Sequence, residues 1–166
     1  CGGFPEKGAE SAKESLQELK QCLKESDMVF VCAGMGGGTG TGGAPVIAQV
    51  ARDTGAIVIG TVTMPFKIEK ARVDKAEFGL EQLRDVSDTV IVIDNNRLVN
   101  IAGNLPIQQA FAVANELIST MIKGIVETIA VPSLVNLDYA DVKAIMRNGG
   151  VAAIGVGASD TNNKVE

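Results

Sequence analysis

The chain has 166 residues, of which 46% are hydrophobic and 21% charged, and its formal net charge is −5. These values are typical of a globular domain, and the acidic balance excludes the basic surface that nucleic acid requires. The sequence contains no histidine, so histidine general bases and histidine metal ligands are excluded.

The three cysteines, Cys1, Cys22 and Cys32, are odd in number, and Cys32 falls inside an apolar run. This usage predicts reduced thiols and a cytoplasmic protein. No stretch has the pattern of a signal peptide or of a bilayer-spanning segment. We also expect membrane contact only through partners. The chain begins with Cys1 rather than Met, and we expect an upstream portion to be missing.

Apolar residues at spacings of three and four predict helices, whereas short continuous apolar runs predict strands buried on both faces. In chain order, these patterns predict a helix at 9–26, a strand at 28–33, a helix at 43–54, a strand at 56–62, a helix at 69–86, a strand at 89–93, a long helix at 106–129, a short helix at 138–147 and a strand at 151–156. Gly55 is expected to end the second helix and Pro106 to begin the long one.

The alternation of strands and helices predicts an α/β fold, a Rossmann-like parallel sheet with helices on both faces. Ligands of such sheets bind beyond the carboxyl ends of the strands. The segments that follow each strand are therefore the candidate site.

The segment after the first strand is unusually rich in glycine. Five of its seven central residues are glycine. Those seven residues are Gly36, Gly37, Gly38, Thr39, Gly40, Thr41 and Gly42. Glycines let backbone N–H groups approach an anion, the helix start adds unpaired donors, and the two threonines add hydroxyls. The loop is predicted to bind phosphate; the alternative, a tight turn, needs fewer glycines.

Two common phosphate-binding motifs do not match the sequence of this loop. A Walker loop ends in Gly-Lys-Ser/Thr, and no lysine follows here. The dinucleotide pattern matches by chance as Gly38-x-Gly40-x-x-Gly43, but the next strand lacks the acidic residue that binds a ribose. A dinucleotide-binding oxidoreductase domain is therefore the less favoured alternative.

The spelling Gly-Gly-Gly-Thr-Gly-Thr-Gly at 36–42 resembles the signature of the tubulin/FtsZ family, and FtsZ in particular. The similarity continues in order through Asp27–Phe30, Pro65–Phe66, 136–143 and 148–150, and covers nearly the whole chain. Archaeal-type members look most similar. The resemblance implies the tubulin/FtsZ nucleotide-binding fold with a long central helix, and GTP or GDP as ligand with Mg²⁺.

The resemblance also assigns residues to the nucleotide. Besides the glycine loop, they are Pro65, Glu69, Arg72, Asn95, Phe111 and Asn115. Arg72 follows Glu69 at a shorter spacing than the family's usual one, which leaves its role open. As an alternative to nucleotide binding, Asn95 or Asn96 could simply form a turn. The alternative for Phe111 is a packing contact in the core. The segment 1–8 resembles the loop that closes over the terminal phosphate, with a frayed terminus as the alternative.

Asn136, Asp138 and Asp141 are the catalytic candidates. The two aspartates lie at a helix start, where capping is the alternative explanation. The resemblance implies that this loop enters the nucleotide site of the next subunit, where the carboxylates orient and polarise the attacking water. Hydrolysis of this kind depends on positioning and charge stabilisation, and it needs no histidine.

The implied protein is a GTP-hydrolysing cytoskeletal protein that polymerises head to tail for prokaryotic cell division, acting in the cytoplasm at mid-cell with other division proteins. The alternative within the family is a filament protein with little hydrolysis. The expected organisation is a GTP-binding domain at 1–105, a central helix at 106–130, and the Asp loop with the start of a second domain at 131–166. We expect the isolated chain to bind GTP weakly and to hydrolyse it poorly.

Overall fold

The computed structural model describes residues 1–97, 107–130, 139–146 and 150–152. The helices of these ranges are α1 (Pro5–Glu14), α2 (Leu16–Leu23), α3 (Thr39–Asp53), α4 (Lys70–Val86), α6 (Ile107–Ala130) and α7 (Tyr139–Met146). The strands are β1 (Met28–Gly34), β2 (Ile57–Met64), β3 (Thr89–Asp94) and β4 (Gly150–Ala152), and a short 3-10 helix, η1 (Lys67–Glu69), precedes α4.

The four strands form one sheet in the order β1-β2-β3-β4, and every neighbouring pair is parallel. The register aligns Gly34 with Thr63 and Met64 with Asp94. The carboxyl ends of the first three strands therefore meet at one edge. The glycine loop and the segments after β2 and β3 all begin there.

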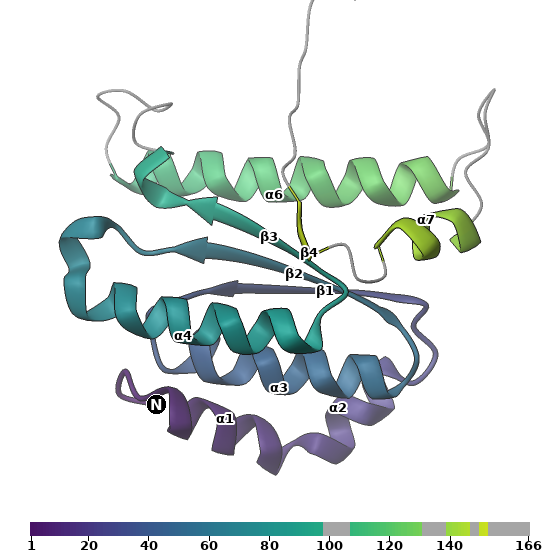
Figure 1. Ribbon diagram of the computed structural model, residues 1–166, viewed down its shortest axis with the longest axis horizontal. Helices are drawn as coiled ribbons and strands as arrows, with labels where there is room; N and C mark the ends of the chain where they lie inside the picture. The colour runs from purple at the N-terminus through teal and green to yellow at the C-terminus, as the bar shows by residue number, and fades with distance from the viewer. Residues whose placement is uncertain (98–106, 131–138, 147–149, 153–166) are drawn as a thin grey trace, which may run out of the picture.

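Helices cover both faces of the sheet (Figure 1). On one face lie α3 and α4, with α1 and α2 packed outside α3, and on the other lies α6. Val58 and Val62 of β2 and Leu83 of α4 belong to the core between the sheet and helices α3 and α4. Ile57, Ile59 and Ile91 form the second core with Met121 of α6. The expected α/β fold with helices on both faces is confirmed.

Two helix boundaries differ from the sequence expectation. The helix expected at 9–26 starts at Pro5 and is divided at Ser15, whose φ of −99° and ψ of 20° leave the helical region. Serine competes for backbone hydrogen bonds, so it is a weak point in a helix. The helix expected from residue 43 begins at Thr39.

The early start of α3 has a packing cause. A Cβ on Gly40 would overlap the Gly34 carbonyl, and one on Gly42 would overlap the Pro5 carbonyl. These glycines let β1 and α1 approach the first turns of α3, and this contact outweighs the low helix propensity of glycine. In the described ranges, no helix has the length and apolarity that crossing a membrane requires.

Candidate functional site

The glycine loop turns sharply between β1 and α3. Gly36 has a φ of +100°, which a side chain rarely adopts, and its N–H donates to Oγ1 of Thr41 at 2.9 Å. The Thr41 side chain is fully buried. Its hydroxyl therefore holds the turn from inside and does not face solvent, whereas Thr39 is exposed.

The loop leaves open space at one position. A Cβ on Gly37 would meet no atom within 4 Å, whereas one on Gly36 would lie 3.0 Å from the Arg72 carbonyl oxygen. The loop is thus packed below and open at Gly37, next to the N-terminus of α3. The first N–H groups of a helix have no partners within it, and they carry a partial positive charge. This combination is suited to an anion.

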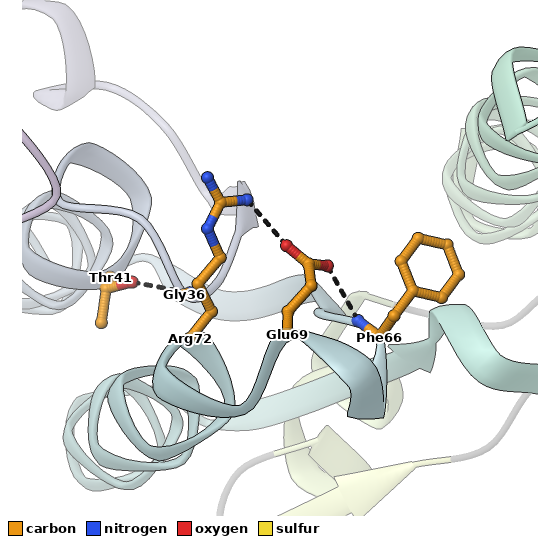
Figure 2. Close-up of polar contacts among 5 residues, drawn as sticks. All are labelled: Gly36, Thr41, Phe66, Glu69 and Arg72. Atoms are coloured by element: carbon orange, nitrogen blue, oxygen red, sulfur yellow. Dashed lines mark hydrogen bonds and ion pairs between the residues drawn. The ribbon is translucent and has the colours of Figure 1, made fainter.

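The segment after β2 brings an acid and a base to the same edge (Figure 2). Glu69 accepts the Phe66 N–H at 3.1 Å through one oxygen and pairs with the Arg72 guanidinium at 2.9 Å through the other. The Arg72 side chain is 65% exposed, so this pair contributes little stability. Arg72 also contacts the loop, because its backbone lies against Gly36. Despite the shortened spacing after Glu69, Arg72 therefore lies beside the glycine loop.

The segment after β3 separates the roles of two asparagines. Asn96 donates from its backbone and side chain to Oδ1 of Asp94, at 2.8 Å and 2.6 Å, and its own Oδ1 accepts the Lys67 N–H. Asn96 therefore makes the turn. Asn95 is 6% exposed, and its Oδ1 has no hydrogen-bond partner among the described residues. A buried acceptor without a partner is costly, which makes Asn95 a candidate ligand-binding group.

The long helix reaches this edge through an aromatic contact. The ring of Phe111 lies 6.2 Å from that of Phe66, at an interplanar angle of 58°. Phe111 remains 44% exposed, and Asn115, one turn along α6, is exposed as well. Pro65 is buried beside Gly36. Phe66 was not among the expected site residues, although its Pro-Phe motif was visible in the sequence.

The catalytic candidates lie elsewhere. Asn136 and Asp138 fall outside the described residues, and Asp141 is exposed in the first turn of α7. Oγ1 of Thr89, at the start of β3, donates to the Met146 carbonyl of α7 at 3.0 Å. Since the strands are parallel, α7 lies at the amino edge of the sheet, at the far end of α6 from the glycine loop (Figure 1).

The described part of the chain contains no disulfide and no cluster of metal-ligating side chains. All three cysteines are free, and partial burial raises the pKa of the Cys32 thiol. Among the described residues, no group of three or more Cys, Asp or Glu side chains is arranged to hold a metal ion.

The structure is a parallel α/β domain whose candidate site lies at the carboxyl ends of β1, β2 and β3. Residues 1–103 match the model of the tubulin/FtsZ family GTPase domain, and the chain belongs to that family. The sequence resemblance is thus confirmed.

Relatives and solved structures agree with this assignment. The chain is 58% identical over 164 residues to cell division protein FtsZ 2 of Methanocaldococcus jannaschii, covering 99% of this chain and 43% of that protein. It is 54% identical over 167 residues to cell division protein FtsZ of Haloferax mediterranei, covering 100% of this chain and 44% of that protein. A solved mutant of M. jannaschii FtsZ superposes with a TM-score of 0.91 at 48% identity, covering 98% of this chain and 49% of that one. An empty FtsZ dimer from M. jannaschii superposes with a TM-score of 0.85 at 48% identity, covering 91% of this chain and 44% of that one. The chain spans less than half the length of these relatives.

Proposed function

We propose that this chain is the nucleotide-binding part of a GTPase that assembles into filaments for prokaryotic cell division. The observation that carries the proposal is the convergence at one sheet edge of an open glycine loop, the Arg72 guanidinium and the unpartnered Asn95 acceptor. Each follows a different parallel strand. Family membership and the names of the relatives support GTP as the ligand.

The residues divide by the part of the nucleotide they suit. The loop backbone, open at Gly37, binds phosphate oxygens together with the first N–H groups of α3, and Thr39 adds an exposed hydroxyl. Thr41 acts from inside the loop by fixing Gly36. Glu69 orients Arg72, whose guanidinium binds a phosphate or the ribose side of the ligand.

The sugar and base contacts come from β3 and α6. Asn95 supplies a buried acceptor to a ribose or base donor. The exposed face of Phe111 stacks on guanine, and the Asn115 amide pairs with its donor-and-acceptor edge. Mg²⁺ is held by phosphate oxygens and water, because such ions are usually bound with substrate phosphates.

Hydrolysis is completed by a second subunit. The glycine loop lies at the carboxyl edge of the sheet, and the helix that carries Asp141 lies at the amino edge. One subunit therefore cannot bring its own Asp loop to its own nucleotide. Head-to-tail contact brings Asn136, Asp138 and Asp141 of one copy to the phosphate of the next, and contacts of this kind build filaments.

The alternative within the family is a filament protein that binds nucleotide and hydrolyses it slowly. The same Asp loop disfavours it, and turnover decides between the two. A dinucleotide-binding oxidoreductase is disfavoured because β2 ends in Thr63 and Met64, with no acid for a ribose. We place the protein in the cytoplasm at the division site, with other division proteins as partners and membrane contact only through them.

The test is GTP hydrolysis per subunit as a function of protein concentration, with the protein in its full natural length. A site shared between subunits gives a concentration threshold, below which turnover per subunit collapses. Turnover per subunit that is constant down to nanomolar protein would show a self-contained site and overturn the proposal. NAD titration by fluorescence tests the oxidoreductase alternative independently.

A further inference from the structure

A short segment at the start of the described chain lies directly on the glycine loop. We call Cys1–Phe4 the strap. Its Phe4 N–H donates to the Cys1 carbonyl at 3.0 Å, and Gly2 and Gly3 have φ values of +56° and +79°. A Cβ on Gly38 would lie 2.9 Å from Cys1 Cβ and from the Phe4 backbone nitrogen. Strap and loop thus touch through atoms next to their backbones.

The strap is fastened from a helix far along the sequence. Nζ of Lys75, on α4, donates to the Gly3 carbonyl at 2.7 Å. The same ammonium lies 5.6 Å from the centroid of the Phe4 ring, and Nζ of Lys7 lies 5.8 Å from it. Hydrogen bonds from a charged donor are among the stronger ones in proteins, and cations are attracted to aromatic faces.

The fastening matters because the strap is otherwise easily disordered. Two of its four residues are glycines in left-handed conformations, which lose more chain entropy on ordering than other residues do. The Phe4 side chain, 55% exposed, is not anchored by burial. The contacts of Lys75 order the strap before a ligand binds. Binding of a ligand that touches the strap then carries a smaller entropic cost.

We propose that Lys75 is a positioning residue that holds the strap against the glycine loop and thereby favours a nucleoside triphosphate over a diphosphate. The inference rests on the proposed function. The strap borders the loop at Gly38, next to the open position at Gly37. A phosphate chain long enough to extend past Gly37 therefore gains the strap as a neighbour. A diphosphate makes fewer contacts there and gains less from an ordered strap.

The test uses the protein in its full natural length with Lys75→Met, which keeps the apolar stem and removes the charge and the donors. Lys75→Arg keeps both, and Lys70→Met is the matched control, since Lys70 is an exposed lysine on the same helix. Lys7→Met removes one cation from the Phe4 ring and leaves the Gly3 hydrogen bond intact. Hydrogen exchange of the Phe4 amide is measured without nucleotide, and GTP and GDP affinities are measured by displacement of a fluorescent guanine nucleotide.

For Lys75→Met we expect exchange at Phe4 to accelerate about tenfold and GTP affinity to fall about tenfold, with GDP affinity within twofold of the parent. Lys75→Arg and Lys70→Met should stay near the parent, and Lys7→Met should show a smaller change. Unchanged exchange at Phe4 overturns the inference, and so does an equal loss of GTP and GDP affinity. If the parent protein binds neither nucleotide, the proposed function fails, and the exchange result alone decides whether Lys75 holds the strap.

Discussion

The hydroxyl of Thr41 offers the sharpest test of how the glycine loop is built. In Thr41→Val the shape of the side chain is kept, but the acceptor for the Gly36 N–H is lost. That N–H is buried under the loop, and the hydrogen bond it makes is 2.9 Å long. A buried donor left without an acceptor costs about 1–3 kcal/mol. We therefore expect the free energy of unfolding to fall by that amount.

Urea unfolding of the 166-residue chain measures the effect, with the midpoint falling at an unchanged m-value. Thr39→Val is the control, because Thr39 lies two residues earlier, is exposed and should change stability by less than about 0.5 kcal/mol. In the full-length protein, Thr41→Val should also weaken GTP binding, whereas Thr41→Ser keeps the acceptor and the affinity. If Thr41→Val unfolds at the parent's urea concentration, the hydroxyl does not hold the loop and the reasoning is refuted.

Two further predictions concern the loop glycines and the Asp loop. Gly42→Ala should destabilise the chain by about 1–3 kcal/mol or more, because its Cβ would overlap the Pro5 carbonyl, whereas Gly37→Ala meets no atom, keeps the melting temperature and weakens only nucleotide binding. Equal melting temperatures for the two variants would contradict the packing argument. In the full-length protein, Asp138→Ala and Asp141→Ala should each abolish GTP hydrolysis while nucleotide binding survives, as followed by phosphate release and nucleotide titration. A parallel loss of binding and turnover would make these aspartates structural.

Local patterns determined a large part of this protein. The buried strands at β1, β2 and β3 are short apolar runs whose character does not depend on their partners, and each lies within two residues of its expected bounds. The motif at 36–42 indicated a phosphate loop and the family from sequence alone. Its signal is local, because the glycines, the threonines and the following helix start are neighbours in the chain.

Contacts between distant residues were decided only by the tertiary structure. No local pattern indicates that Thr41 turns inward to Gly36, that Asn96 rather than Asn95 makes the turn after β3, or that Phe66 contacts Phe111. Lys75 reaches a carbonyl 72 residues away, a contact that no periodicity reports. The early start of α3 has the same origin, since close packing there overrides the low helix propensity of glycine.

The placement of the two halves of the proposed active site shows this division most clearly. The sequence alone named the glycine loop and the aspartates, because each motif is local. Only the parallel sheet, with α6 running along it, places α7 at the amino edge and the loop at the carboxyl edge. Strand direction is a property of pairing between distant segments, and it is the physical reason that the proposed active site requires two subunits.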